Sequence, residues 1–284
     1  MLSYLESICI ITGINLIAVL GLAFFTGFTG NFSFGHAGFV ALGAYASAIS
    51  SVRLSLPFPV SLALGALVAG LVAFGIGIPT LRIKGTYFAI VALGFGETVR
   101  ISTIMLKDLT GGASGYSAIP LQTTLPWVLA LSILSFILVW NLAYSPVGRA
   151  CVCVKNDEIA ASASGIPVHR TRLTAFVVSG VLCGLSGGLL AHYLTYLQPN
   201  MFDIAMSSQL SITVLLGGLN SVTGPTIATF ILVTLPEVFR LLAKWRLTIY
   251  GLAIILTVIV RPEGLLGGRE LTLWRREDSS LGAR

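Results

Sequence analysis

Ser7–Val52, which reads SICIITGINLIAVLGLAFFTGFTGNFSFGHAGFVALGAYASAISSV, runs for 46 residues without a charged side chain. A membrane-spanning helix needs roughly 20 predominantly apolar residues, so this stretch is long enough for two. Its middle is interrupted by Gly27, Gly30, Gly35 and Gly38. Glycine weakens helix continuity. The stretch therefore predicts two helices in a bilayer, joined by an irregular segment.

The rest of the chain continues this pattern. Only 10% of the 284 residues are charged and 55% are hydrophobic, whereas a soluble domain carries about 25% charged residues. The apolar runs are continuous and do not alternate in polarity, which excludes a soluble domain, a disordered chain and an outer-membrane barrel. The expected fold is all-α, a polytopic helical membrane protein with about 8–10 transmembrane helices, some broken or re-entrant. The expected spans are 8–27, 33–51, 58–79, 86–106, 124–143, 173–196, 205–219, 222–239 and 247–260.

The basic residues predict how the chain is oriented, because cytoplasmic loops collect Lys and Arg. If residues 144–172 are cytoplasmic, the inside set is Arg82, Lys84, Arg149, Lys155, Arg170, Arg172, Arg261, Arg269, Arg275, Arg276 and Arg284. The outside set is Arg53, Lys107, Arg240, Lys244 and Arg246. This bias predicts an N-terminus outside and a C-terminus inside. We expect a membrane domain over 1–260, including the cytoplasmic loop 144–172, and a cytoplasmic tail over 261–284.

Two Gly-rich segments share a pattern. Gly27–Gly38 follows the first expected span, Gly217–Pro225 separates the seventh from the eighth, and in each an Asn is followed four residues later by a Gly. Backbone groups freed by Gly and Pro survive in a membrane only inside protein or beside a wet cavity. We expect a pseudo-repeat around a central pathway, although small residues also serve close helix packing. The candidate pathway residues are Gly30, Asn31, Gly35, His36, Gly217, Gly218, Asn220 and Gly224.

The longest polar segment between the spans, Ser145–Arg172, predicts one short helix over about residues 157–164. Asn156 is the expected N-cap, and the acids that follow it favour the positive first turn. Gly165 suits the left-handed position after a helix, and Pro167 prevents continuation. The helix has few large apolar residues, which favours docking into a groove of a cytosolic partner over lying on the membrane surface. The expected contact residues are Arg149, Asn156, Asp157, Glu158, Ala160, Ala161 and Gly165.

Few other residues are candidates for chemistry. Glu97 and Arg100 share one face of the fourth expected span, where a mutual pair or a contact with a neighbouring subunit is favoured over a contact with substrate. His36 either faces the cavity or fixes its turn through a hydrogen bond. The three histidines lack metal-site spacing, and no nucleophile lies beside a base. We therefore expect no enzymatic activity, and no metal or cofactor in this chain.

Taken together, the segments resemble membrane subunits of ABC importers for branched-chain amino acids, the LivM type. Importer permeases generally carry an E-A-A-x-x-x-G loop. Ala160, Ala161 and Gly165 match it, while Ile159 occupies the Glu position and Glu158 lies one residue earlier. The resemblance covers nearly the whole chain and is carried by Gly27–Gly38, Leu81–Arg100, Leu109–Gly115, Ser145–Leu173, Leu215–Pro225 and Arg261–Leu266.

The resemblance implies a pore subunit that forms half of a pathway for branched-chain or related amino acids in a bacterial or archaeal cytoplasmic (inner) membrane. It implies a second homologous permease, a periplasmic or lipid-anchored substrate-binding protein, and two cytosolic subunits that bind ATP and Mg and grip the 157–165 helix. The chain itself contains no G-x-x-x-x-G-K-[ST] loop. Its surroundings are membrane lipid, and no nucleic acid is expected. The alternative is a secondary transporter or channel for small polar solutes, although the intramembrane acids typical of ion coupling are few.

Overall fold

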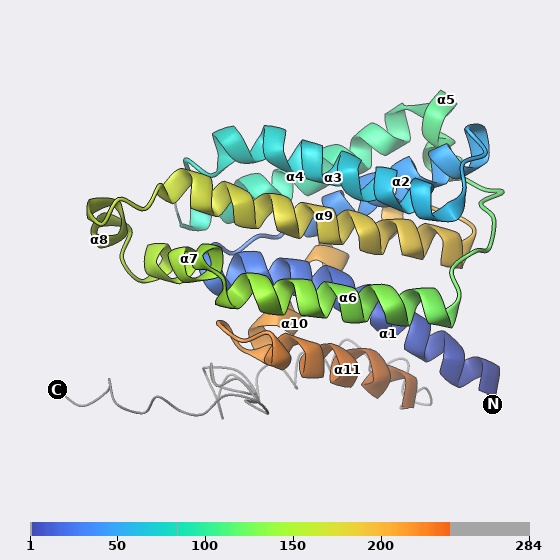
Figure 1. The fold of residues 1–284 in the computed structure, drawn as a ribbon. Coiled ribbons are helices and arrows are strands. Elements are labelled where there is room, and N and C mark those ends of the chain that lie inside the picture. The colour runs from blue at the N-terminus through green and yellow to red at the C-terminus, as the bar shows by residue number, and fades with distance from the viewer. Residues whose placement is uncertain (1, 84, 239–284) are drawn as a thin grey trace.

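The computed structural model describes residues 2–83 and 85–238, which form a bundle of helices (Figure 1). In chain order the elements are α1 (Leu2–Leu22), the π-helical turn η1 (Ala23–Gly27), α2 (His36–Arg53), α3 (Phe58–Thr80), α4 (Thr86–Met105), α5 (Lys107–Thr110), the 3₁₀ turn η2 (Gly112–Ser114), α6 (Leu125–Tyr144), α7 (Pro146–Asn156), α8 (Glu158–Ala163), α9 (Val168–Leu194), the 3₁₀ turn η3 (Pro199–Met201), α10 (Ile204–Gly217) and α11 (Thr223–Val238). Within these residues the β pairing is a single bridge between Tyr116 and Leu197. The all-α expectation is confirmed.

Five described helices are long and apolar enough to cross a membrane: Leu5–Gly27, α3, α4, α6 and α9. The others that follow expected spans are shorter or less apolar. The 14 residues of α10 extend about 21 Å. Helix α9 begins at Val168 and not at 173, so Arg170 and Arg172 belong to its first turns and not to a loop. The expected span 247–260, the Arg240–Arg246 cluster and the tail 261–284 lie outside the described residues.

Helices α2, α3 and α9 pack closely in the upper half of the bundle (Figure 1). Glycines allow this approach. A Cβ at Gly43 of α2 would overlap the backbone of Gly184 in α9, and a Cβ at Gly187 would overlap the carbonyl of Val40. A Cβ at Gly65 of α3 would lie 2.6 Å from the carbonyl oxygen of Gly43. Because lipid tails are as apolar as the side chains, membrane helices associate largely through such close van der Waals contact.

The bundle has two distinct ends. Helix α8 projects at one end, whereas α5 and the start of α1 lie at the other (Figure 1). Arg82 and Arg172 line the same cavity beside α8, while Arg53 donates a hydrogen bond to the carbonyl of Asp108 in α5. Arg82 and Arg172, from the expected inside set, thus lie near α8, and Arg53, from the expected outside set, lies near α5.

Candidate functional site: two helix breaks and an exposed helical arm

The first break separates η1 from α2 and is built around His36. Gly30, with φ of +75°, ends the first helix. His36 is fully buried, and its Nδ1 lies 2.9 Å from the Oγ of Ser33, in the irregular segment. Its Nε2 lies 2.7 Å from the Oγ of Ser179 in α9. Of the two roles expected for His36, the structure shows the hydrogen bond that fixes the turn, and it adds a link to α9.

Aromatic side chains enclose this histidine. The ring centroids of Phe25, Phe39 and Phe176 lie 5.9, 5.6 and 6.1 Å from that of His36. The rings of Phe39 and Phe176 meet His36 edge to face, an arrangement that aromatic quadrupoles favour. The first break is therefore held by a packed polar centre inside an apolar shell.

The second break separates α10 from α11 and depends on close backbone approach. Gly218 has φ of +110° and Asn220 has φ of +72°, conformations that glycine and asparagine adopt most readily. A Cβ on Gly217 would overlap Pro225, and a Cβ on Gly224 would overlap the carbonyl of Gly217. The facing ends of α10 and α11 can meet only because both positions lack a side chain.

The predicted pathway residues fall into two groups. Gly35, His36, Gly217, Gly218 and Gly224 are buried in helix contacts, and a Cβ on Gly35 would overlap Ala92 of α4. The others, Gly30, Asn31 and Asn220, are exposed or half-buried. The two breaks also approach each other, since a Cβ on Gly27 would lie 3.4 Å from the backbone nitrogen of Asn220.

Lys155 of α7, which the sequence did not single out, joins the two breaks. Its Nζ donates hydrogen bonds to the carbonyl oxygen of Gly27 at 2.8 Å and to Oδ1 of Asn220 at 2.7 Å. The side chain is half-buried, and burial lowers the pKa of its ammonium group. These partners lie 128 and 65 residues away in the chain, so no local sequence pattern predicts the contact.

The polar segment between α6 and α9 contains two helices, where the sequence predicted one. The Oγ of Ser145 accepts hydrogen bonds from the backbone nitrogens of Val147 and Gly148, and Pro146 occupies the first turn of α7. A serine cap followed by proline is a strong helix-start signal, and it could have revealed α7. A Cβ on Gly148 would overlap the carbonyl of Ala143, so this glycine permits the tight turn from α6.

The expected N-cap of the next helix is wrong by one residue. Asn156 is the last residue of α7, and the N-cap of α8 is Asp157. Its Oδ1 accepts from the backbone nitrogens of Ile159 at 2.8 Å and Ala160 at 3.0 Å. The physical reason is that α7 continues through Asn156, so the first extended residue able to cap α8 is Asp157, with φ of −152°.

The other end of α8 forms as predicted. Gly165 adopts φ of +82°. Its backbone nitrogen donates to the carbonyl of Ser162, and that of Ile166 donates to the carbonyl of Ala161, both at 3.0 Å. This pair of bonds is the Schellman motif, which satisfies carbonyls that a helix end leaves free. With caps at both ends, α8 is a defined helix in spite of its six residues.

The outer surface of α8 is unusually apolar for an exposed turn. Ile159 is 83% exposed, and Ala160 and Ala163 are exposed beside it. Ala161 is buried and anchors the helix to the protein. On α7, Arg149 is also exposed. Sequence reasoning predicted the small residues of this surface but not that Ile159 would be its most prominent side chain.

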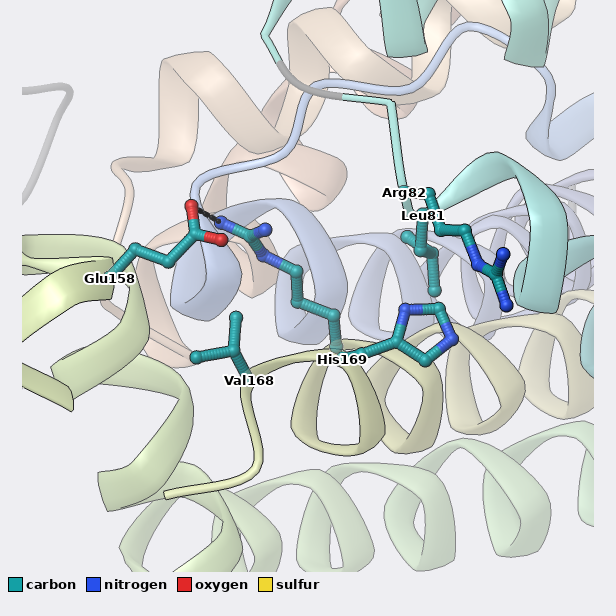
Figure 2. Close-up of a pocket in the computed structure, with 6 residues that line it drawn as sticks. Leu81, Arg82, Glu158, Val168 and His169 are labelled. Carbon is teal, nitrogen blue, oxygen red and sulfur yellow. Dashed lines mark hydrogen bonds and ion pairs between the residues drawn. The ribbon is translucent and has the colours of Figure 1, made fainter. Parts of the chain in front are cut away.

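A cavity of about 500 Å³ lies between α8, the start of α9 and the end of α3 (Figure 2). Glu158 and Arg172 form an ion pair across it, with Oε2 and Nη2 3.4 Å apart. Nε of Arg172 is buried and has no hydrogen-bond partner among the described residues. The lining residues are Leu81, Arg82, Glu158, Val168, His169 and Arg172. With three basic side chains and one acid, the cavity suits an acidic group from a partner.

Glu97 and Arg100 pair with each other, as the sequence favoured. Nε of Arg100 donates to Oε2 of Glu97 at 2.8 Å, and Nη1 donates to Oδ1 of Asn200 at 3.1 Å. The side chains of the pair are 24% and 26% exposed, so neither charge is isolated in apolar surroundings. Over the described part of the chain, no group of three or more His, Cys, Asp and Glu side chains is placed to hold a metal ion.

An apolar bundle with two broken helices, joined to a capped and exposed helical arm, defines a membrane transport subunit. The chain belongs to the family described as the permease component of the branched-chain amino acid transport system, whose model matches residues 4–260. The expected resemblance is thereby confirmed, and the chain is a permease subunit of an ABC importer. The family is one of transport components and not of enzymes. This membership also decides against the secondary transporter or channel.

Individual relatives agree with the family. The chain is 32% identical to the high-affinity branched-chain amino acid transport system permease protein LivM of Escherichia coli strain K12. It is 33% identical to the protein of that name in Salmonella typhimurium strain LT2. Both alignments cover 91% of this chain and 69% of the relative. The ribose import permease protein RbsC of Haemophilus influenzae is 24% identical, over 92% of this chain and 84% of that protein. No solved structure matches the chain.

Proposed function

We propose that this permease forms half of the translocation pathway for branched-chain or related amino acids. The LivM relatives named for branched-chain amino acids are more similar to the chain than the ribose permease is, which supports this substrate class. A second, homologous permease completes the pathway, and a periplasmic or lipid-anchored binding protein delivers the substrate. Two cytosolic subunits bind ATP and Mg.

The observation that carries the proposal is the exposed surface of α8. Ile159, which is 83% exposed, and the exposed Ala160 and Ala163 beside it give a helix capped at both ends an apolar outer surface. A contiguous exposed apolar surface favours an interaction site. The basic cavity beside it adds charge complementarity for an acidic side chain of an ATPase. We infer that the ATPase covers Ile159, Ala160 and the mouth of this cavity, while Asp157 and Gly165 keep α8 rigid enough to transmit movement.

The pathway itself is proposed to run beside the two breaks. The exposed members of the predicted set, Gly30, Asn31 and Asn220, contribute backbone and amide groups to it. The buried members, among them His36 and Gly217, hold the breaks in shape. Glu97 and Arg100 neutralise each other and help anchor α4 to η3 through Asn200. A pathway with few unpaired charges suits a zwitterionic solute that must bind weakly and leave again.

The proposed site of action is a bacterial or archaeal inner membrane, with α8 in the cytoplasm and the start of α1 outside. More of the described basic residues lie toward the end with α8 (Arg82, Arg149, Lys155, Arg170 and Arg172) than at the end with α5 (Arg53 and Lys107). This bias supports the orientation, because cytoplasmic segments are enriched in basic residues. Since α8 and the start of α1 lie at opposite ends (Figure 1), cytoplasmic docking of α8 places the N-terminus outside.

Ile159→Lys tests the docking surface. We expect the permease to fold but to lose its ATPase during affinity purification in mild detergent, because an ammonium group would be buried in an apolar contact. Leu54→Lys is the matched control. Leu54 is 64% exposed at the end of α2 away from α8, and its change should leave the ATPase bound. Full retention of ATPase by the Ile159 variant would contradict docking through α8.

Uptake by the reconstituted transporter tests the substrate class. Proteoliposomes holding both permeases, the ATPases and the binding protein should accumulate radioactive leucine with ATP and Mg inside, and should not accumulate ribose. Accumulation driven by a proton gradient without ATP would refute the ABC mechanism. Uptake of ribose and not leucine would refute the substrate class.

A further inference from the structure

Lys155 links three parts of the protein that are distant in sequence. It lies in the last turn of α7, two residues before the N-cap of α8, and its ammonium group reaches the first break at Gly27 and the second at Asn220. The two distances, 2.8 and 2.7 Å, are those of good charge-assisted hydrogen bonds. A single side chain thus connects the proposed ATPase-docking arm to both breaks.

The aliphatic part of the side chain is fitted to the same place. A Cβ on Gly30 would lie 3.0 Å from Cγ of Lys155, so the lysine stem packs against the glycine that ends the first helix. Gly30 also has φ of +75°, a conformation that side chains other than Asn and Asp rarely adopt. The ammonium group of Lys155 therefore contacts both breaks, and its stem packs on the first. A shift of α7 must either carry the breaks along or break these contacts.

We propose that Lys155 is the positioning residue through which movement of the α7–α8 arm controls the distance between the two breaks. In the conformation described here the ammonium holds Gly27 and Asn220 together. When the ATPases move α8, the adjoining turn of α7 moves with it, and the lysine releases at least one partner. This inference rests on the proposed docking of α8, and it adds the route from α8 to the pathway.

Asn220 is suited to a contact that forms and breaks. Its left-handed backbone, with φ of +72°, aims the amide oxygen at Lys155 from an exposed position. A hydrogen bond to a charged group is stronger than a neutral one, but it is weaker where water can replace it. Such a contact can bias two conformations without locking either.

The test compares Lys155→Met with Lys155→Arg in the complete reconstituted transporter. Methionine keeps much of the stem and removes the donors, whereas arginine keeps the charge and can reach one or both acceptors. The measured quantity is leucine transported per ATP hydrolysed. For Lys155→Met we expect this ratio to fall about 10-fold, as loss of a charge-assisted hydrogen bond allows. Lys155→Arg should recover a large part of it.

Lys107→Met is the matched control. It changes an exposed lysine on α5, at the opposite end of the bundle, and should keep the wild-type ratio of leucine transported per ATP hydrolysed.

A double-mutant cycle with Asn220→Gly assigns the effect to the contact. Glycine tolerates the left-handed backbone and removes only the amide. If the hydrogen bond carries the coupling, the double variant should transport no worse per ATP than Lys155→Met alone, because the two changes remove one shared interaction. Additive losses would overturn the proposed route. If the Lys155 variants fail to assemble, a wild-type ratio in Asn220→Gly would also overturn it.

These measurements separate the route from the function on which it rests. If Lys155 served only to stabilise the fold, Lys155→Met would lower the melting temperature and leave the transport ratio unchanged, and the inference would be wrong. If the wild-type complex shows no ATP-dependent leucine uptake, the proposed function itself fails before the variants are compared.

Discussion

The imidazole of His36 is fully buried, so both of its ring nitrogens need hydrogen-bond partners. Ser33 and Ser179 supply them, at 2.9 and 2.7 Å, inside a shell of phenylalanines. An unpartnered buried polar atom costs about 1–3 kcal/mol, so the serines and the histidine form one unit that depends on all three members. The neighbouring Gly-rich sequence predicts a break here, and this unit explains why the break has one defined shape.

We therefore expect His36→Ala to destabilise the fold by about 2–4 kcal/mol, because it opens a cavity and removes one hydrogen-bond partner from each of two buried hydroxyl groups. The thermal unfolding midpoint of the detergent-purified protein should fall clearly. His169→Ala is the matched control, since His169 is half-buried at the cavity beside α8, and it should unfold near the wild-type temperature. An unchanged midpoint in His36→Ala would favour a histidine that faces the pathway.

Individual residues also show which features of the site the sequence predicts and which it does not. Gly165 was predicted correctly because a helix end, a glycine and a nearby proline form a local signal. Asn156 was mistaken for the cap because the preceding helix was not recognised, and a cap is defined only relative to a helix. Lys155 could not be found, because its role depends on partners brought together by the whole fold.

At the scale of elements, α7 and α8 form one arm between α6 and α9. Helix α7 is joined to α6 through Ser145, and α8 is joined to α9 through Gly165 and the ion pair of Glu158 with Arg172. The apolar runs predicted most of the long helices, because spans are defined by hydrophobicity. They did not predict α7, whose polar and apolar residues are mixed, or the π-helical turn at Ala23–Gly27, which has no distinct composition.

The rigidity of this arm can be tested at Gly165. A Cβ there would meet nothing within 4 Å, so a substitution is strained only by φ of +82°. We expect Gly165→Val to cost about 1–2 kcal/mol locally and to loosen α8, and Gly165→Asn to cost less because asparagine tolerates this conformation. Transport per ATP hydrolysed should be lowest for valine and intermediate for asparagine.

The control for that series is Gly94→Val in α4. Gly94 is another exposed glycine whose added Cβ would meet nothing within 4 Å, but its backbone is helical. Transport per ATP should therefore stay near the wild-type value. Equal losses in Gly94→Val and Gly165→Val would show that added bulk, and not the left-handed cap, causes the defect.

At the scale of the whole molecule, the positions of the few charged side chains bear on how transport is powered. Among the described residues, Arg82, Glu158 and Arg172 line the cavity beside α8, whereas Arg53, Lys107 and Asp108 lie at or beside α5. Helices α8 and α5 are at opposite ends of the bundle (Figure 1). The pair of Glu97 and Arg100 neutralises itself along α4. Over the described residues this arrangement shows no row of acids to couple an ion gradient to transport, which agrees with the proposal that energy enters through the exposed arm.

The orientation that follows from this arrangement can be measured with single cysteines. After replacement of the four free cysteines, Cys9, Cys151, Cys153 and Cys183, one cysteine is introduced at Ile159 or at Leu54, both exposed and at opposite ends. A membrane-impermeant maleimide should label Leu54→Cys in intact spheroplasts, because the impermeant reagent reaches only the outer face. It should label Ile159→Cys only in inverted vesicles freed of the ATPase. The reverse pattern would place α8 outside the cell, where no cytosolic ATPase can reach it, and would contradict both the orientation and the docking proposal.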